Sequence, residues 1–363
     1  MSEPSDVVVG LSGGIDSSLA AALLKHAGWD VHGLHFLMPA SPSRVDVRLK
    51  RVREIAERLN IQLHIMDLRE IFSEDIINPF IDSYLDGLTP NPCVVCNQLI
   101  KFKYLLYYAK ENDLHWISTG HYVRLRKRLK PSVTELLRGR DRRKEQSYFL
   151  HRLDQRYLAT AIFPLGEMTK DEARNKARKI GLPLLSIPES HDICFLPEND
   201  YRLFINEKRG AEINRPGNII DVYGKIAGKH AGAFRYTIGQ RHGLGIASSL
   251  PYYVKEVRPE TNEVIVGRRN ELYSDVVEAE DFNWVEGIIP ERHTGLYAQI
   301  RYRHKPGAGS LEILSPHKVR FKFDEPEWAV APGQALVCYE GERVIGGGWI
   351  TKDVNVHEFK GGR

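Results

Sequence analysis

A short turn rich in glycine and serine constrains the fold of this chain more than any other stretch. Residues 12–18 read Ser-Gly-Gly-Ile-Asp-Ser-Ser, and they follow the apolar run Val-Val-Val-Gly-Leu at 7–11. A continuous apolar run is typical of a strand buried in a parallel sheet. The apolar spacing after the turn predicts a helix that stops near Gly28. The stretch therefore predicts a strand, a tight turn and a helix.

This turn is predicted to bind the phosphates of a nucleotide. The first N–H groups of a helix lack partners inside the helix, so they form a natural anion site. Glycines let the backbone approach a phosphate closely, and Ser12, Ser17 and Ser18 can add hydroxyl donors. No Lys-Ser/Thr pair follows the glycines, which excludes a Walker A loop, and the run is not G-x-G-x-x-G. It matches S-G-G-x-D-S, the loop of the ATP pyrophosphatases, which adenylate a substrate oxygen and release pyrophosphate.

The segments that follow predict a doubly wound α/β domain. Residues 30–38, 61–68 and 116–121 read as strands, and 45–59 reads as a helix with one apolar face. Strands separated by helices of this length indicate a parallel sheet with ligands at the carboxyl ends of its strands. Such ends place Met38, Gly120 and His121 at the rim of the site, although Met38 could equally belong to the core.

A chain of 363 residues is too long for one compact core. The composition changes near residue 200, after which short β segments with many glycines give way to regularly alternating strands. Regular strands with turn signals predict a small β-rich module followed by a closed β-barrel. We expect domain boundaries at 1–202, 203–267 and 268–363.

The bulk composition is that of an ordinary globular protein, with 42% hydrophobic and 27% charged residues. The net charge of +4 is too small to indicate a nucleic-acid partner by itself. No apolar run approaches the ~20 residues of a membrane span, and the first residues have no apolar signal region. We therefore expect a cytoplasmic protein with no membrane partner.

One segment concentrates positive charge. Residues 124–144 contain ten Lys or Arg and two Asp or Glu. A charge run is often a solvated loop, but an excess of one sign beside the predicted rim favours contact with a phosphate backbone. A later helix is predicted from Thr169, because Thr-Lys-Asp-Glu forms a capping box, and it should end at Gly181.

The cysteines suggest sulfur or metal chemistry. Four cysteines in this length argue against a disulfide framework. Cys93 and Cys96 lie in a proline-rich stretch just before a predicted helix, and Cys194 follows much later. A helix dipole favours a nearby thiolate, so we expect a depressed pKa for Cys96 and a nucleophilic role. Cys338 has strand surroundings and is predicted to lie in the core.

Three roles remain open for the three clustered cysteines. In a sulfur relay, Cys96 carries a terminal persulfide and Cys194 resolves the product by forming a disulfide. Alternatively, Cys93, Cys96 and Cys194 hold an iron–sulfur cluster with one iron open to bind sulfide. Structural zinc would need a fourth ligand, such as His191 or Cys338.

The ordered motifs closely resemble those of the tRNA-specific 2-thiouridylase (MnmA) family over nearly the whole chain. The matching motifs are S-G-G-I-D-S-S, F-L-M, T-P-N-P-C-V-V-C-N, S-T-G-H-Y, K-E-Q-S-Y-F-L, S-H-D-I-C-F, P-G-N-I, Y-T-I-G-Q-R-H-G-L-G-I and P-G-Q-A-L-V-C-Y. In that family ATP adenylates O2 of the wobble uridine of tRNA, and sulfur then displaces AMP. A cysteine desulfurase or sulfur carrier protein supplies the sulfur.

The resemblance implies roles for individual residues. ATP, with Mg²⁺, would bind Gly10, Leu11, Ser12, Gly13, Gly14, Ile15, Asp16, Ser17, Met38 and Gly120. Asn91, Pro92 and Cys93 would face the target base, Cys96 would be the nucleophile and Cys194 would carry the persulfide. The anticodon stem-loop would touch His121, Lys144, Glu145, Gln146, Arg301, Tyr302 and Gln334. Asp16 suits either magnesium positioning or a helix N-cap.

Three features depart from the usual family pattern. Many members have Asp where this chain has Cys93, the segment between Met38 and Val45 is short, and His191 stands where Gln is usual. The added thiol supplies a third soft ligand, so the sequence favours a 4Fe-4S cluster on Cys93, Cys96 and Cys194 over a simple persulfide relay.

Two other classes of function are compatible with parts of the chain. A small-molecule adenylating synthetase would share the loop at 12–18 but would need neither the cysteines nor the basic segment. An RNA-binding module would explain the basic segment and the barrel but not the loop.

Overall fold

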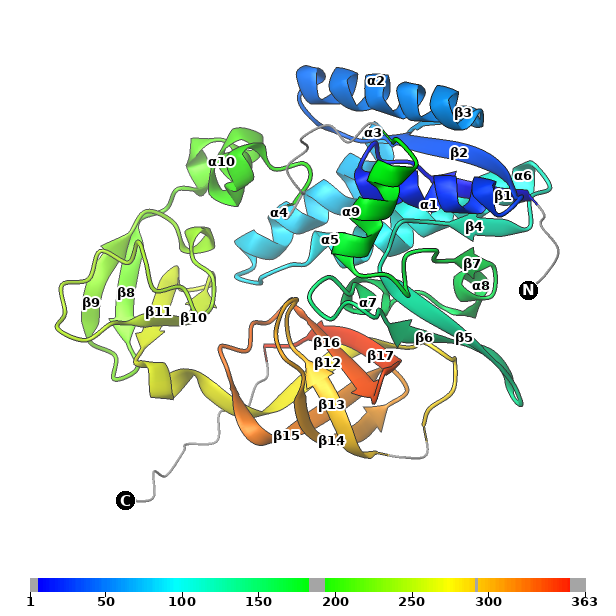
Figure 1. Cartoon of the computed structure of the whole chain (residues 1–363). Helices are drawn as coiled ribbons and strands as arrows, with labels where there is room; N and C mark the ends of the chain where they lie inside the picture. Colours follow the sequence, from blue (N-terminus) through cyan, green and yellow to red (C-terminus); the bar gives the residue numbers. More distant parts are fainter. Residues whose placement is uncertain (1–5, 183–192, 291–292, 353–363) are drawn as a thin grey trace.

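The computed structural model describes residues 6–182, 193–290 and 293–352. An α/β domain, a small β module and a β-barrel follow one another along the chain, and the barrel lies against the α/β domain (Figure 1). This arrangement confirms the predicted fold class.

The α/β domain is built on a parallel sheet with the strand order β3-β2-β1-β4-β7. Its strands are β1 Asp6–Gly10, β2 Asp30–Leu37, β3 Gln62–Asp67, β4 Trp116–Ser118 and β7 Ala161–Ile162. The order reverses between β1 and β4, because the chain runs outward to β3 and then returns to the other side of β1. In open α/β sheets, ligands bind at the carboxyl ends of the strands that flank such a reversal.

Helices cover both faces of this sheet. They are α1 Ile15–His26, α2 Pro42–Leu59, α3 Arg69–Phe72, α4 Asn78–Leu85, α5 Pro92–Cys96, α6 Lys103–Glu111, α7 Ser147–Leu150, α8 Gln155–Leu158 and α9 Lys170–Lys179, with wider helical turns at Ser73–Ile77 and Asn97–Phe102. Val7 and Val9 pack with α1 and α2, whereas Val8 packs in the core that contains α6. The apolar run of β1 is thus buried on both sides.

Most of the basic segment forms a β-hairpin, although runs of charged residues are often solvated loops. β5 Val123–Leu129 and β6 Ser132–Arg138 pair antiparallel, and β6 meets the barrel strand β17. Its arginines pair with carboxylates: Arg126 with Glu135 at 2.5 Å, Arg128 with Glu286 at 2.5 Å, and Arg124 with Glu342. Much of the expected positive charge is therefore neutralised within the protein.

The second part of the chain contains α10 Tyr201–Arg209 and a sheet of order β10-β11-β8-β9. These strands are β8 Gly217–Asp221, β9 Ile226–His230, β10 Tyr253–Arg258 and β11 Glu263–Gly267. Short turns separate them, as the glycine content predicts.

The barrel runs in the order β12-β15-β14-β13-β16-β17 and closes where β12 pairs with β17. Its strands are β12 Tyr273–Trp284, β13 Thr294–Gln299, β14 Gly307–Ser315, β15 Lys318–Trp328, β16 Ala335–Glu340 and β17 Arg343–Ile350. Closure pairs every strand and so removes exposed sheet edges.

Barrel and α/β domain share one hydrophobic core. Val337 and Tyr339 of β16 are buried in the same cluster as Ile100 and Phe102 of the α/β domain. The Tyr148 hydroxyl also donates to the Ala335 carbonyl at 3.1 Å. The barrel is thereby held directly against the segment that contains the cysteines.

Among the described residues, none of the helices combines the length and apolarity that crossing a membrane requires.

The predicted capping box at Thr169 is present. The Thr169 hydroxyl accepts from the Glu172 N–H at 3.2 Å, and the Glu172 carboxylate accepts from the Thr169 N–H at 2.8 Å. We expect Thr169→Ala to lower the free energy of unfolding by about 1 kcal/mol, since it leaves an N–H of the first turn without its partner. Urea denaturation would measure the change, with Thr169→Ser as the conservative control; an unchanged midpoint in the alanine variant would contradict it.

Candidate nucleotide and thiol site

The turn after β1 has the geometry of an anion cradle. Gly14 is the N-cap of α1, and Gly13 has a φ of 77°, which favours glycine. The hydroxyls of Ser12 and Ser17 lie 3.0 Å apart, and Ser17 donates to the Gly14 carbonyl at 3.1 Å. Ser18 is buried and donates to the same carbonyl at 2.8 Å, so its hydroxyl belongs to the helix rather than to a ligand.

The carboxylate of Asp16 is held by two side chains from other elements. The Tyr122 hydroxyl donates to Oδ1 at 2.8 Å, and the Lys170 ammonium donates to both oxygens at 2.7 Å. Because Gly14 occupies the N-cap and no side chain caps α1, the N-cap interpretation of Asp16 is wrong. The sequence analysis did not identify Lys170, although the capping box at Thr169 places it at the start of α9.

Gly120 fits against the first turn of α1. A Cβ atom on Gly120 would lie 2.6 Å from the backbone carbon of Asp16 and 2.6 Å from the backbone nitrogen of Ser17. Any side chain would therefore separate these two segments. Met38 directly follows β2 and is half-buried against the main core. This position is compatible with both predictions, a residue of the core and a residue at the rim of the nucleotide site.

The cysteine stretch lies within one helical segment rather than before a helix. α5 ends at Cys96, and the chain continues through the wide turn 97–102 into α6. Cys93 is half-buried in the first turn, whereas Cys96 is buried. The expected depressed pKa of Cys96 is wrong: burial raises the pKa of Cys93 to about 11 and that of Cys96 to about 12. Loss of hydration outweighs the helix dipole here.

Lys101 is a functional candidate that the sequence analysis missed. Its positive charge opposes the rise in the pKa of Cys93 and of Cys96, which places its ammonium near both thiols. The ammonium donates to the Asn97 side-chain oxygen at 2.9 Å, and Asn97 in turn donates to the Phe149 carbonyl at 3.2 Å. A lysine one helical turn beyond a cysteine was the available signal.

His121 connects the thiols to the nucleotide turn. Its Nδ1 lies 2.7 Å from the Thr119 hydroxyl, and its ring contacts Phe102 with centroids 6.0 Å apart. Burial and the nearby charge of Lys101 lower the pKa of His121 to about 3, so the ring is neutral. Residues 119–122 thus contact the first turn of α1 through Gly120 and Tyr122. Through His121 they contact Phe102 of the helical segment 92–111 that contains Cys93 and Cys96, the thiol helix.

The remaining cysteines differ in exposure. Cys194 is exposed, and it adds to the raised pKa of both Cys93 and Cys96, so it lies within electrostatic range of both thiols. Cys338 is fully buried in the barrel core, as predicted. His191 lies outside the described residues. Within 6–182, 193–290 and 293–352, no group of three or more His, Cys, Asp or Glu side chains is arranged to hold a metal ion. All four cysteines are free thiols.

Several residues predicted to touch RNA have partners within the protein. Gln334 donates to the Thr89 carbonyl at 2.8 Å, which joins the barrel to the loop before Cys93. Asn91 hydrogen-bonds Tyr148, and Pro92 is buried as the first residue of α5. Arg301 donates to the Trp328 carbonyl at 2.9 Å.

The predicted triplet 144–146 lies at the end of the hairpin. Glu145 is buried, and its carboxylate accepts from Ser147 at 2.6 Å and from Arg138 at 3.3 Å. The Gln146 side chain accepts from the Tyr122 N–H at 3.0 Å. Lys144 is half-buried beside them. Gln146 therefore ties this triplet to the segment that holds Asp16.

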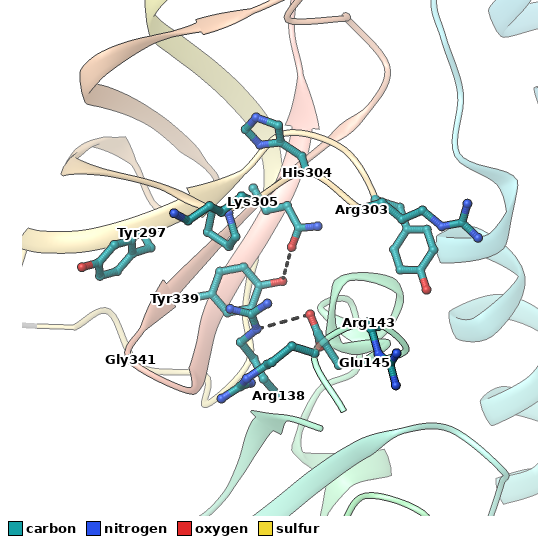
Figure 2. Close-up of a pocket in the computed structure, with 13 residues that line it drawn as sticks. Arg138, Arg143, Glu145, Tyr297, Arg303, His304, Lys305, Tyr339 and Gly341 are labelled. Carbon is teal, nitrogen blue, oxygen red and sulfur yellow. Dashed lines mark hydrogen bonds and ion pairs between the residues drawn. The ribbon is translucent and has the colours of Figure 1, made fainter. Parts of the chain in front are cut away.

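A basic cavity of about 510 Å³ lies between this segment and the barrel. Its lining includes Arg138, Arg142, Arg143, Tyr297, Tyr302, Arg303, His304 and Lys305. Figure 2 shows Arg138 and Arg143 in its lower part, with Lys305 and Arg303 above them. The His304 ring is 2.9 Å from Glu327, but burial lowers the pKa of His304 to about 4 and raises that of Glu327, so a neutral imidazole is favoured.

Tyr302 connects this cavity to the thiol site. Its ring packs against Phe149 with centroids 4.3 Å apart. Burial raises the pKa of Tyr302, and Cys93 adds to the rise, which places that thiol near the phenol. Among the described residues, Arg303 and Lys305 have no ion-pair partner, and both are exposed.

The fold and the site define a protein with a nucleotide-binding α/β domain followed by two β modules. Family models match each part: the tRNA methyl transferase HUP domain over residues 5–198, the tRNA methyl transferase PRC-barrel domain over 203–268 and the aminomethyltransferase beta-barrel domain over 274–350.

Curated relatives match the chain almost from end to end. The tRNA-specific 2-thiouridylase MnmA of Carboxydothermus hydrogenoformans is 43% identical over 360 residues, covering 95% of this chain and 97% of the relative. The MnmA of Acidithiobacillus ferrooxidans is 41% identical over 344 residues, covering 94% and 97%. That of Geotalea uraniireducens is 43% identical over 361 residues, covering 96% of each. The chain belongs to the tRNA-specific 2-thiouridylase MnmA family, as its motifs predicted.

The position of Lys101 gives a testable consequence for the thiols. Its charge favours the thiolate, so Lys101→Met should raise the pKa of Cys93 and Cys96 further and slow their alkylation at a given pH. Iodoacetamide labelling followed by mass spectrometry across a pH series would measure this. Lys103→Met, an exposed lysine on the same helical segment, is the matched control. Equal labelling profiles for the two variants would contradict the assignment.

Proposed function

We propose that this protein catalyses the ATP-dependent 2-thiolation of the wobble uridine of tRNA. The observation that supports it most strongly is the segment 119–122, which contacts the nucleotide turn on one side and the thiol helix on the other. Adenylation and sulfur transfer need these two groups beside one carbonyl group of the substrate. A small-molecule synthetase would need the turn alone.

Activation comes first in this proposal. The O2 atom of uridine attacks the α-phosphorus of ATP, an O–P bond forms, and pyrophosphate leaves with the electron pair of the broken P–O bond. The N–H groups at the start of α1 and the close backbone approach of Gly13 bind the phosphates. Magnesium, held by Asp16, would offset the charge on the leaving pyrophosphate.

Sulfur enters at the exposed thiol. A donor protein, such as a cysteine desulfurase or a sulfur carrier, can reach Cys194 but not the buried Cys96. The terminal sulfur of a Cys194 persulfide attacks C2 of the adenylated uridine, and AMP leaves. The Cys96 thiolate then attacks Sγ of Cys194, which forms a disulfide and releases the new sulfur on uridine. Both cysteines end the cycle in the disulfide, so a cellular thiol reductant must restore them.

In the proposed reaction, Lys101 assists deprotonation of the Cys96 thiol. Burial keeps the Cys96 thiol protonated at neutral pH, and a thiol must lose its proton to attack a disulfide sulfur. The ammonium of Lys101 favours the anion at the thiol site. The proposal uses thiols alone and does not require Cys93. The sequence favours a 4Fe-4S cluster instead, but we propose the relay because no group of three or more His, Cys, Asp or Glu side chains within the described residues is arranged to hold a metal ion.

The RNA is proposed to approach across the barrel and the segment 138–145 at the end of the hairpin, where the basic cavity lies. The basic cavity, which Tyr302 helps to line, has the volume of a small ligand site, and several cationic side chains line it. Exposed Arg303 and Lys305 can contact phosphates of the anticodon stem-loop, and an extruded base can stack on an aromatic side chain. Tyr302 contacts Tyr148, with ring centroids 6.3 Å apart, and Tyr148 hydrogen-bonds Asn91 of the loop 89–92, which would face the target base.

Cysteine substitutions test the sulfur pathway. We expect Cys96→Ser and Cys194→Ser to abolish thiolation while retaining tRNA-dependent release of pyrophosphate, because adenylation precedes sulfur transfer. Pyrophosphate release and thiouridine content by mass spectrometry measure the two steps. Thiolation by Cys96→Ser would remove that residue from the mechanism, and pyrophosphate release on a small acceptor without tRNA would favour a synthetase.

Cys93→Ser is the matched control for these variants. A thiol relay needs only Cys96 and Cys194, so this variant should thiolate normally. Loss of thiolation together with iron and sulfide in the wild-type protein would replace the relay by a cluster on the three cysteines.

Salt dependence tests the RNA surface. Replacing Arg303 and Lys305 by Gln should reduce the slope of log K against log salt by about one unit per cation that contacts a phosphate. Replacing Arg126 and Arg128 should leave the slope nearly unchanged and lower stability, because buried Glu135 loses both partners. The reverse pattern in filter-binding titrations would assign RNA contact to the hairpin.

A further inference from the structure

Lys170 and Asp16 form an ion pair inside the nucleotide turn. Lys170 is the first residue of α9, and its ammonium lies 2.7 Å from each oxygen of Asp16. The Lys170 side chain is 8% exposed, whereas that of Asp16 is 34% exposed. The carboxylate is therefore reachable from the ligand side, and the ammonium approaches it from the protein interior.

The surrounding structure holds Lys170 by its backbone, while its side chain contacts Asp16 and Tyr122. The Thr169–Glu172 capping box sets the start of α9, and the Lys170 N–H donates to the buried Asp141 carboxylate at 3.0 Å. These bonds fix the backbone only. The ammonium is bound to Asp16 and lies over the Tyr122 ring, 5.6 Å from its centroid.

The pair leaves the nucleotide turn electrically neutral before ligand arrives. Asp16 is the only charged residue in the segment 10–18, and Lys170 cancels its charge. A turn whose side-chain charges cancel attracts a polyphosphate only through the N–H groups at the start of α1. Adding a divalent cation at Asp16 while Lys170 stays nearby changes the local charge to about +2, and Coulomb attraction for the phosphates rises accordingly.

Asp16 cannot serve both cations fully, because the ammonium engages both of its oxygens. We propose that Lys170 changes partner when MgATP binds: its ammonium leaves Asp16, which takes Mg²⁺, and pairs with the phosphates of the nucleotide. This inference rests on the proposed use of ATP. Without nucleotide, Lys170 then neutralises Asp16. With MgATP bound, it binds the phosphates.

Two binding measurements on Lys170→Met separate this exchange from a purely structural ion pair. Without its competitor, Asp16 should bind Mn²⁺ alone about tenfold more tightly, measured by electron paramagnetic resonance. The Mg²⁺ complex of α,β-methylene-ATP should bind about ten- to a hundredfold more weakly, measured by calorimetry, because a charge-assisted hydrogen bond is lost. Lys176→Met, an exposed lysine of the same helix, should change neither affinity.

Asp16→Asn supplies a second test that keeps Lys170 in place. The exchange predicts that metal-free α,β-methylene-ATP binds this variant more tightly than wild type, because the ammonium is already released and the repelling carboxylate is gone. A structural pair predicts weaker binding, since the turn loses its support. Parallel loss of both affinities in Lys170→Met, or weaker metal-free binding in Asp16→Asn, would overturn the exchange.

The outcomes also separate this inference from the proposed function. A wild-type protein that binds no nucleotide would overturn both. Normal nucleotide binding that Lys170→Met leaves unchanged would overturn the exchange alone. The predicted affinity changes in a protein that never thiolates tRNA would support the exchange and reject the proposed activity.

Discussion

The close approach of Gly120 to the first turn of α1 is the contact on which the site depends. No side chain fits between Gly120 and the backbone of Asp16. This packing brings the carboxyl ends of β1 and β4 together where the strand order reverses. It also brings Tyr122 to Asp16 and His121 to the thiol helix. One backbone contact thus joins the groups proposed for adenylation to those proposed for sulfur transfer.

Burial governs the chemistry on both sides of that contact. Cys96 and His121 lose hydration, so the thiol keeps its proton and the imidazole stays neutral. The charged groups that remain are lysines with short-range partners: Lys101 on Asn97, and Lys170 on Asp16. In such surroundings a single ammonium has large effects, because water does not screen it. The two lysines are therefore the residues to which we assign electrostatic roles at the thiol site and at the nucleotide turn.

The barrel completes the site from the other side. Gln334 fixes the loop before Cys93, and Tyr339 extends the core of the α/β domain. The hairpin β5–β6 bridges the two domains through paired arginines rather than presenting them all to a ligand. Exposed cations without an ion-pair partner in the described structure lie instead at Arg303 and Lys305, beside the basic cavity. A shared hydrophobic core packs the barrel, which presents the proposed RNA surface, against the domain that holds Cys93 and Cys96.

The sequence by itself determined the order of the elements, the nucleotide turn, the capping box at Thr169, the barrel and the family, because each depends on local spacing or on an ordered set of motifs. Only the tertiary structure decided the state of Cys96, the pairing of the basic segment and the partners of Asp16. These depend on which groups meet across long sequence separations: Asp16 is 154 residues from Lys170, and Arg128 is 158 residues from Glu286. Local sequence patterns carry no information about contacts between residues that are far apart in the chain. Burial and charge pairing at these contacts determine the chemistry of the site.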